Sequence, residues 1–441
     1  MKSPILITAV MMIKNDVIII GAGPAGMMAA GVAAGRGFRV LLVERNERPG
    51  RKLMITGKGR CNVTNNCSLN EFIDNVPCGG KFLYSAFSHF TPADLIEFFE
   101  ARHVPLKVER GRRVFPVSDK AVDIVDALQG FICQSGCRMI HGRVSALLLE
   151  NGQVSGVRLE SGATYEAAAV VLCTGGSSYP VTGSTGDGFT LAKAAGHTVT
   201  PLRASLVPIE TAEEWPKALQ GLSLRNITLE VYDSQKGKTV YSELGELLFT
   251  HFGVSGPLVL SASAHMSDAK TLSTSGYRLR IDLKPALSKE QLDKRLQRDL
   301  LKFANRDFIN SLGELLPAKL IPVFAALCAI PPQTKSNQIT KTQRAAIVEL
   351  LKGLTLTVKG PRPIEEAIVT SGGVKLSEIN PSTMESKLVK GLYFAGEVID
   401  SDGYTGGYNL QIAFSTGHLA GVSVLKERIG TDPNKHQEDS L

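Results

Sequence analysis

The first clear hydrophobic pattern is a short apolar run from Val17 to Ile20. A run of this length that ends in turn residues is typical of a strand buried on both faces of a parallel sheet. Residues Gly21 to Gly26 follow with the spacing G-x-G-x-x-G, and the small residues Met27 to Ala34 predict a helix. A second apolar run, Arg39 to Glu44, ends in an acid 18 residues after Gly26. This order predicts a dinucleotide-binding unit.

The three glycines of the turn are expected to have different roles. Gly21 permits the tight turn, Gly23 lets the backbone approach a pyrophosphate, and Gly26 lets the helix pack closely on the strand. The phosphates would lie at the helix N-terminus, and the carboxylate of Glu44 would bind the ribose hydroxyls. The alternative is a structural turn followed by a surface glutamate.

The middle of the chain changes from helical to strand-like spacing. Two helical stretches are predicted within 81–134, and two strands flank Asn151 and Gly152, a dipeptide typical of hairpin turns. The apolar run 167–172 then leads into the glycine-rich segment 173–188. That segment lacks a G-x-G-x-x-G of its own, so a second nucleotide fold for nicotinamide is not expected.

The second half predicts a β unit that is interrupted by helices. Residues 201–283 alternate in the manner of antiparallel strands, and 288–352 have helical spacing broken by prolines. Strand patterns return at 354–358 and 367–370, so the helices are predicted to be an insertion.

Composition narrows the class of protein. The chain has 441 residues, of which 43% are hydrophobic, and it has no apolar run near the ~18 residues that span a bilayer. The start, Met1 to Ile13, superficially resembles a signal peptide but runs into the first strand without a cleavage site, so we expect an extension and a cytoplasmic protein. The 7 cysteines form no CxxC pair, so neither a disulfide framework nor a metal site is expected.

The net charge of +7 is unevenly distributed. Between Lys284 and Lys359 there are 13 Lys and Arg but 6 Asp and Glu, so this window carries the whole excess. It is either the solvated face of helices or a patch that meets phosphates or an acidic partner.

A basic loop follows the ribose-binding strand. Arg51, Lys52 and Arg60 are expected to meet an anionic cofactor or substrate, although a flexible loop would have the same composition. Cys61 follows Arg60, and a neighbouring cation can tune a thiol.

The end of the chain repeats the combination of elements found at its start, namely a strand, an acid, a glycine-rich turn and a helix. A strand over 392–395 leads to Gly396 and Glu397, and a glycine-rich loop precedes a helix that begins near Asn409. Glu397 could hold ribityl hydroxyls, and the N–H groups of residues 408–411 could stabilise charge on a reduced flavin.

Four segments carry a resemblance to a known family: Gly21 to Gly26, Gly50 to Asn65, Thr174 to Gly176 and Gly396 to Gln411. With them the chain resembles the BaiN/RdsA (aminoacetone-oxidase-like) family of FAD-dependent oxidoreductases from Ile13 to about Lys426. The resemblance implies FAD as cofactor and NAD(P)H as reductant. It also implies one of three substrates: a uridine of large-subunit ribosomal RNA, a bile-acid steroid, or a small amine.

The predicted fold is α/β, a Rossmann-like domain of the two-dinucleotide-fold flavoproteins with an inserted β-barrel-like domain that carries a helical insert. The predicted segments are the FAD-binding domain at 13–200 and 373–428, the β-rich substrate domain at 201–285 and 353–372, the helical insert at 286–352, and extensions at 1–12 and 430–441.

The predicted cofactor-binding residues come from five segments. They are Gly21, Gly23, Pro24, Ala25, Gly26, Glu44, Arg45, Arg51, Lys52, Gly59, Arg60, Val144, Thr174, Gly175, Gly176, Gly396, Glu397, Gly407, Tyr408, Asn409, Leu410 and Gln411.

The leading hypothesis is an NAD(P)H-driven reductase of an activated C=C bond, which requires a proton donor. The candidates for that donor are Cys61, His251 and Tyr404. The alternatives are an oxidase of a small amine such as aminoacetone and a flavin-stabilised RNA-binding or assembly factor. The sequence does not decide the oligomeric state.

Overall fold

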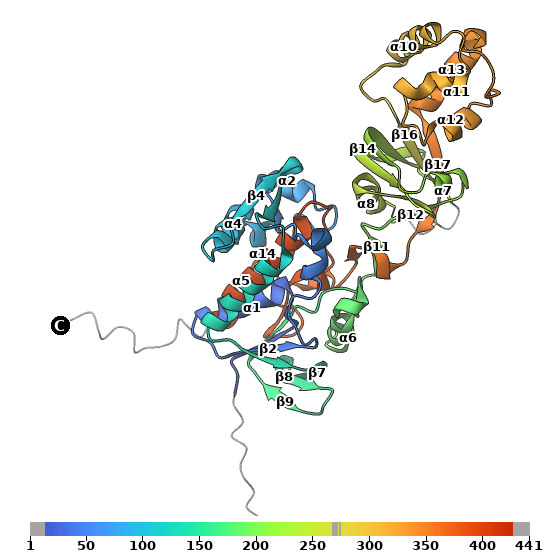
Figure 1. Cartoon of the computed structure of the whole chain (residues 1–441). Helices are drawn as coiled ribbons and strands as arrows, with labels where there is room; N and C mark the ends of the chain where they lie inside the picture. The colour runs from blue at the N-terminus through green and yellow to red at the C-terminus, as the bar shows by residue number, and fades with distance from the viewer. Residues whose placement is uncertain (1–13, 267–271, 273–274, 427–441) are drawn as a thin grey trace, which may run out of the picture. The chain divides into compact units, whose positions relative to one another are not determined.

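The computed structural model describes residues 14–266, 272 and 275–426. The chain divides into two compact units (Figure 1). One contains the described residues up to Leu202 and from Val369 onward, and the other is Arg203–Ile368. The predicted domain boundaries, with their separate helical insert, stay a prediction.

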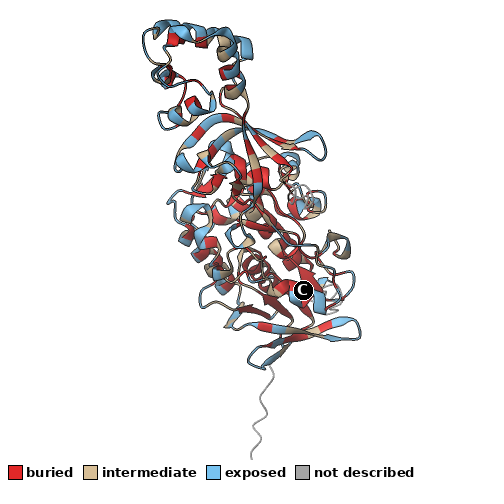
Figure 2. Cartoon of the chain, turned by 90° about the vertical axis from the view of Figure 1, so that its right-hand side faces the viewer, coloured by how far each residue is buried: buried red, intermediate tan, exposed pale blue. Residues whose placement is uncertain are grey.

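The first unit is built on a five-stranded parallel sheet in the order β19-β10-β1-β2-β6. Its strands are β1 (Val17–Ile20), β2 (Val40–Glu44), β6 (Arg138–His141), β10 (Ala169–Leu172) and β19 (Leu392–Phe394). Every residue of β1, β2, β10 and β19 is buried, as the red strands of Figure 2 show. The predicted burial of the first strand on both faces is therefore confirmed.

Two helices from opposite ends of the chain pack closely in this unit. They are α1 (Pro24–Gly35) and α14 (Tyr408–Ser423). A Cβ at Gly417 would lie 2.3 Å from the carbonyl oxygen of Ala25, and one at Gly421 would lie 2.9 Å from that of Ala29. Glycine at these positions lets the two backbones approach, so the C-terminal helix completes the core around the first one.

Two small antiparallel sheets complete the strands of the first unit. They have the orders β3-β5-β4 and β7-β8-β9. The strands are β3 (Thr64–Asn65), β4 (Leu106–Glu109), β5 (Arg113–Pro116), β7 (Val144–Glu150), β8 (Gln153–Leu159) and β9 (Thr164–Glu166), with β18 (Val369–Ser371) later in the chain. Asn151 and Gly152 join β7 to β8 with φ of 49° and 77°, which confirms the predicted hairpin.

The first unit has five further helices among the described residues, of which α5 is the longest. They are α2 (Leu69–Asp74), α3 (Tyr84–His89), α4 (Pro92–Glu100), α5 (Ala121–Gln134) and α6 (Asp187–Ala194), with the 3₁₀ turns η1 (Leu53–Gly59), η2 (Arg110–Arg112), η3 (Pro180–Thr182), η7 (Leu376–Glu378) and η8 (Gly396–Val398). The segment predicted as a plain loop after Glu44 therefore contains a 3₁₀ turn and a strand.

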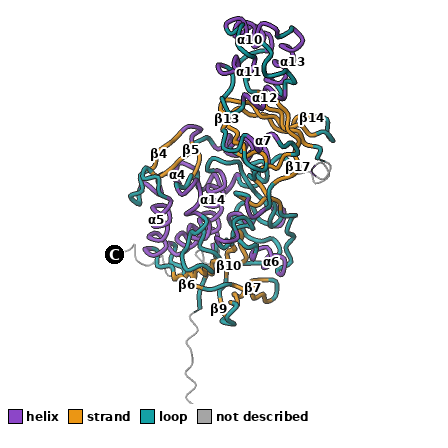
Figure 3. Tube along the Cα trace, turned by 45° about the vertical axis from the view of Figure 1, so that its right-hand side comes forward, coloured by secondary structure: helices purple, strands orange, loops and turns teal. Residues whose placement is uncertain are grey.

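The second unit is a closed barrel in the order β12-β15-β14-β13-β16-β17, drawn in orange in Figure 3. Its strands are β12 (Ile209–Thr211), β13 (Ser223–Asp233), β14 (Lys238–Phe249), β15 (Gly253–Ser255), β16 (Tyr277–Asp282) and β17 (Leu354–Pro361), with β11 (Arg203–Ser205) outside the barrel. The protein combines a parallel α/β sheet with a closed barrel, as the sequence predicts. The fold class is therefore confirmed.

The helices of the second unit lie beside the barrel. Along the chain, they come between the barrel strands or after them. They are α7 (Trp215–Ala218), α8 (Pro257–Ser263), α10 (Lys289–Lys302), α11 (Phe308–Ser311), α12 (Ile321–Leu327) and α13 (Lys341–Lys352), with η4 (Leu312–Glu314), η5 (Ser336–Gln338) and η6 (Ile364–Glu366). Ser288 caps α10 in the predicted capping box with Gln291. Ile281 of β16 pairs with Leu354 of β17, so the helices α10 to α13 leave and re-enter the barrel at adjacent positions.

Within the described residues, no helix has both the length and the apolar character needed to cross a membrane.

Candidate functional site

The candidate site lies at the carboxyl ends of β1 and β10, where the order of the sheet reverses. From β1 the chain continues through α1 to β2 on one side, while β10 lies on the other side. Open parallel sheets bind ligands at such a switch point. The two turns are close, since a Cβ at Gly21 would lie 2.6 Å from the carbonyl oxygen of Cys173.

The glycine turn has the geometry that its spacing predicts. Gly21 adopts a φ of +98°, and a Cβ at Gly26 would lie 1.8 Å from the carbonyl oxygen of Gly21. A Cβ at Gly23 would instead meet no atom within 4 Å, and Gly23 caps α1 without a side-chain hydrogen bond. The first turn, which also contains Pro24 and Ala25, can therefore receive a pyrophosphate on its free N–H groups.

Glu44 is buried beside this turn. Its Oε2 accepts from the N–H of Ala22 at 2.6 Å, and its Oε1 accepts from the N–H and Nδ2 of Asn46, both at 2.8 Å. Each carboxylate oxygen has two lone pairs, so Glu44 can support the turn and still accept from ribose hydroxyls. The ribose contact itself stays a prediction.

The segment after β10 contributes an unusual hydroxyl. The Oγ1 of Thr174 is buried and has no hydrogen-bond partner in the part of the chain that the structure describes. A buried polar atom in that state costs free energy unless a ligand supplies the partner. This hydroxyl lies against α6, since a Cβ at Gly188 would be 1.9 Å from it, so the observation that fits the pyrophosphate of an FAD molecule is the open face at Gly23.

Three segments meet around the carboxylate of Glu397. Lys52 Nζ donates to Glu397 Oε2 and to Ser178 Oγ, both at 2.7 Å. Glu397 Oε1 accepts from Ser178 Oγ at 3.0 Å and from the N–H of Thr370 at 2.8 Å. A Cβ at Gly176 would lie 2.8 Å from that same oxygen. The predicted residues Lys52, Gly176 and Glu397 are thus brought together, with Lys52 bound to the carboxylate.

Sequence reasoning missed Ser178 and Thr370, which complete this cluster. Ser178 follows the Thr-Gly-Gly segment by two residues, which was the one available signal. Thr370 is near Glu397 only in space, since 27 residues separate them.

The other predicted cations have protein partners. Arg45 donates to Thr185 Oγ1 at 2.5 Å and to Asp187 Oδ2 at 3.1 Å, and Arg51 lies 3.5 Å from Asn46 Oδ1. Arg60 forms ion pairs with Glu109 and Asp119 and stacks over the ring of Phe115. The cofactor contacts of these three residues stay predictions.

The expected tuning of the Cys61 thiol by Arg60 is wrong. Cys61 is fully buried, and that burial raises the pKa of the Cys61 thiol to about 12. The opposing effect, a hydrogen bond with Thr56, is smaller. Arg60 does not offset this desolvation, because it forms ion pairs with two carboxylates, those of Glu109 and Asp119.

The start of α14 is locked against the first half of the chain. Gly407 caps the helix with a φ of +102°, and a Cβ there would lie 2.2 Å from the carbonyl carbon of Thr64. Asn409 accepts from the N–H of Gly403 at 2.9 Å and donates to its carbonyl oxygen at 2.7 Å. The N–H groups of Tyr408, Asn409 and Leu410 belong to the first turn, which has no intrahelical acceptors for them.

Gln411 differs from its expected role. Its N–H donates to the carbonyl oxygen of Gly407 at 3.1 Å, so it is not available for a flavin. Its side chain is fully buried, accepting from Thr64 Oγ1 at 2.6 Å and donating to the carbonyl oxygen of Phe90 at 3.1 Å. Helix geometry explains the difference, because the fourth residue after the N-cap donates its N–H to the carbonyl oxygen of the N-cap residue.

The remaining predicted residues have these positions. Gly59 ends η1, and Val144 is buried at the start of β7. Gly175 has a φ of +72°. A Cβ at Gly396 would lie 2.9 Å from the Cβ of Ala25.

The two other proton-donor candidates lie in different units. Tyr404 is half-buried in the loop before α14, and its N–H donates to the carbonyl oxygen of Asn75. His251 is exposed between β14 and β15 in the other unit, edge-on to Phe252. Their roles stay predictions.

Known proteins resemble this chain over nearly its whole length. Residues 15–423 match the family described as HI0933-like protein Rossmann domain. The chain is 32% identical over 417 residues to a 3-dehydro-bile acid delta(4,6)-reductase of Clostridium scindens, covering 92% of this chain and 98% of that protein. It is 32% identical over 404 residues to a ribosomal RNA dihydrouridine synthase of Escherichia coli, covering 91% and 96%.

A solved structure supports the fold. The 3-ketosteroid-delta4-(5alpha)-dehydrogenase of Rhodococcus jostii is 16% identical with a TM-score of 0.50, covering 94% of this chain and 98% of that one. The family match extends through the glycine turn, the barrel and α14, so the similarity is not confined to one nucleotide-binding motif. The chain belongs to the HI0933-like Rossmann family and is an FAD-dependent oxidoreductase.

Proposed function

We propose that the protein is an NAD(P)H-driven reductase of a C=C bond conjugated to a carbonyl group. The observation that carries this proposal is end-to-end similarity to two enzymes with different substrates. One is named for reducing a bile acid and the other for forming dihydrouridine, and both reactions add two hydrogens to such a bond. The bond type is therefore the property that the relatives share.

A uridine in ribosomal RNA is the substrate that we favour. Two relatives, from Escherichia coli and Haemophilus influenzae, carry that name. The basic window between Lys284 and Lys359 also suits a polyanion. Five of its six carboxylates form ion pairs with cations of the same window, namely Asp293, Asp299, Asp307, Glu314 and Glu349, so the excess positive charge resides on the other cations. Such an enzyme would act in the cytoplasm.

The protein's own residues would hold the cofactor and supply a proton. The first turn of α1, Glu44 and Thr174 would bind the adenylate part, and the start of α14 would face negative charge on the ring system. FAD supplies hydride transfer when bound. The added proton would come from a protein group, for which Tyr404, Cys61 and His251 are the candidates.

Mass spectrometry of ribosomal RNA from a deletion strain tests the substrate. We expect one dihydrouridine to disappear and to return when the intact gene is supplied. A gene carrying Gly26→Val, which places a side chain against Gly21 at the nucleotide turn, should not restore it. An unchanged dihydrouridine content would contradict the RNA substrate.

Anaerobic mixing with NADPH or NADH tests the reductant and separates reductase from oxidase. We expect the flavin absorbance to bleach with one of the two nicotinamides and to recover slowly in air. Rapid recovery in air together with reduction by aminoacetone would instead support the oxidase.

A bile-acid or other steroid enone is the second candidate substrate, because the Clostridium scindens relative covers the chain as completely as the RNA enzymes do. Reoxidation of the reduced enzyme by a steroid enone, but not by RNA, would favour it.

A further inference from the structure

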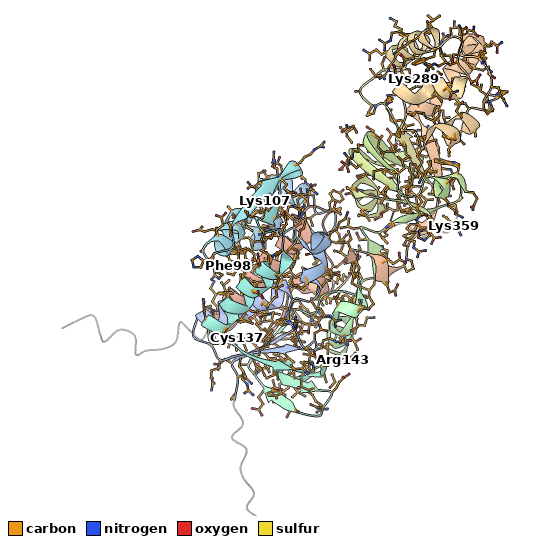
Figure 4. The ribbon with its side chains drawn as sticks, viewed as in Figure 1. Phe98, Lys107, Cys137, Arg143, Lys289 and Lys359 are labelled. Atoms are coloured by element: carbon orange, nitrogen blue, oxygen red, sulfur yellow. The ribbon has the colours of Figure 1, made fainter. Side chains whose placement is uncertain are left out.

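The hairpin of β4 and β5 carries three arginines at its tip. Glu109 pairs with Arg113 across the hairpin, and Arg110, Gly111 and Arg112 form the turn. Gly111 and Arg112 have φ of +75° and +59°, and all three arginines are exposed. The hairpin belongs to the first unit, and Lys107 marks its β4 strand in Figure 4.

The nearby acids are already occupied by other cations. Glu109 and Asp119 form ion pairs with Arg60 and Lys107. Glu71 forms an ion pair with Arg112, with 2.6 Å between Glu71 Oε2 and Arg112 Nη1.

Arg110 and Arg113 form no ion pair within the described part of the chain. Arg113 Nε donates to the carbonyl oxygen of Arg110 at 3.0 Å, which leaves its terminal amino groups available. Two guanidinium groups with free donors therefore project from one turn.

The tip is fixed next to the candidate site. Asn65 Nδ2 donates to the carbonyl oxygens of Gly111 and Gly406, both at 3.0 Å. The N–H of Asn66 donates to the carbonyl oxygen of Arg112 at 2.8 Å. Gly406 immediately precedes the cap of α14, so the same asparagine holds the arginine turn and the loop that leads into α14.

These arginines are not placed for the phosphates of the cofactor. The pyrophosphate belongs at the first turn of α1, at the carboxyl end of β1. The hairpin is attached instead to the start of α14, which would face the ring system in the function proposed above. A bile acid offers a single carboxylate, whereas a nucleotide chain carries a phosphate at every residue and can therefore engage both guanidinium groups.

We propose that Arg110 and Arg113 bind backbone phosphates of an RNA substrate beside the nucleotide that is reduced. The proposal rests on the RNA substrate proposed above and adds a surface on the first unit, separate from the helices of the second. Phosphate contacts of this kind position a nucleic acid without reading its sequence. The rigid turn would place the neighbouring nucleotides while the target base enters the site.

The test uses the full-length, flavin-loaded protein and a short fluorescently labelled RNA hairpin. Fluorescence anisotropy gives the affinity between about 50 and 200 mM salt. The double variant Arg110→Gln with Arg113→Gln should bind about 10-fold more weakly, and its log–log salt slope should fall by about 1.5, because two phosphate contacts are lost. Flavin content and the melting temperature should not change.

Two further variants separate charge from structure. Arg158→Gln with Lys193→Gln removes two exposed cations from β8 and α6 of the same unit and should leave the salt slope within error. Arg110→Lys with Arg113→Lys keeps the charge and should retain most of the slope.

Each outcome has one meaning. Selective weakening of the Gln variant supports the proposal. If the intact protein binds RNA but the Gln variant behaves like the Arg158 and Lys193 control, the hairpin assignment is overturned and the RNA substrate stands. If the intact protein shows no salt-dependent RNA binding, both proposals are overturned.

Discussion

The ammonium group of Lys52 links the loop after β2 to the return segment of the first unit. It lies 2.7 Å from Glu397 Oε2, and both side chains are about one-fifth exposed, at 21% and 19%. A pair buried to this degree is screened less than a surface pair, and its charges depend on one another. Removing the cation would leave Glu397 with Ser178 and the N–H of Thr370 alone.

Lys52→Met should therefore weaken FAD binding by about 10-fold, or about 1.4 kcal/mol. The loop would lose its anchor, and an uncompensated carboxylate would remain beside the anionic cofactor. Titration of the apoprotein with FAD, followed by flavin fluorescence, measures the dissociation constant. Arg48→Met in the same loop is the matched control, because Arg48 is exposed, and equal affinities of the two variants would contradict the prediction.

Cys61 should resist alkylation in the native protein. The thiolate is the reactive form, and a fully buried thiol with a pKa of about 12 is almost entirely protonated at pH 8. Exposed Cys133 should react first with iodoacetamide, as peptide mass spectrometry can show. Labelling of Cys61 at the rate of Cys133 would mean that the thiol is accessible and acidic, as a cation-tuned residue would be.

At the scale of elements, the contact between α1 and α14 depends on missing side chains. Gly417 lies against the backbone of Ala25, where a Cβ would have only 2.3 Å to the carbonyl oxygen. Neither helix presents a single apolar face, because both are buried at most positions. Their packing is thus set by backbone approach, and added volume must separate them.

Gly417→Ala should destabilise the protein by about 1–3 kcal/mol through overpacking. Gly130→Ala is the control, because a Cβ at that position in α5 would meet no atom within 4 Å. Alanine there should be neutral or stabilise by up to about 1 kcal/mol, since glycine costs that much inside a helix. Urea unfolding followed by circular dichroism compares the two, and similar midpoints would show that the helices can move apart freely.

The sequence predicted the elements better than their mutual contacts. Gly21, Gly23, Gly26 and Glu44 act locally, within one strand–turn–helix–strand unit, so spacing alone places them. Lys52 and Glu397 are 345 residues apart, and no local pattern predicts that they form an ion pair. The burial of Cys61 and the side-chain bonds of Gln411 likewise depend on which distant segments cover them.

For the whole molecule, one buried and one half-buried histidine couple the stability of the first unit to pH. His197 lies 2.8 Å from Ser386 Oγ and 3.3 Å from Glu378 Oε2, and it packs edge-on against Phe394 of β19. Burial lowers the pKa of the His197 imidazole below its ordinary value, despite the nearby carboxylate of Glu378. Burial also lowers the pKa of His418, which stacks on Phe90.

Stability should therefore fall as the pH drops below about 6.5. The unfolded chain takes up protons at that pH, while the folded protein keeps both imidazoles neutral until a lower pH. Each histidine can contribute up to about 1.4 kcal/mol per pH unit in this interval and nothing above it. Urea midpoints at several pH values between 7.5 and 5 measure the slope.

His197→Gln should reduce this pH dependence, because one of the two titrating groups is gone. His141→Gln, at an exposed position on the edge strand β6, is the control and should leave the slope unchanged. A slope that stays the same in both variants would assign the acid sensitivity to other groups.

The position of β19 and α14 also has a consequence for biosynthesis. They complete the sheet and the helix layer that β1 and α1 begin, so a nascent polypeptide lacks part of its cofactor cradle until translation has passed Ser423. Flavin loading should then require synthesis of β19 and α14, and truncated products that stop before Leu392 should purify colourless.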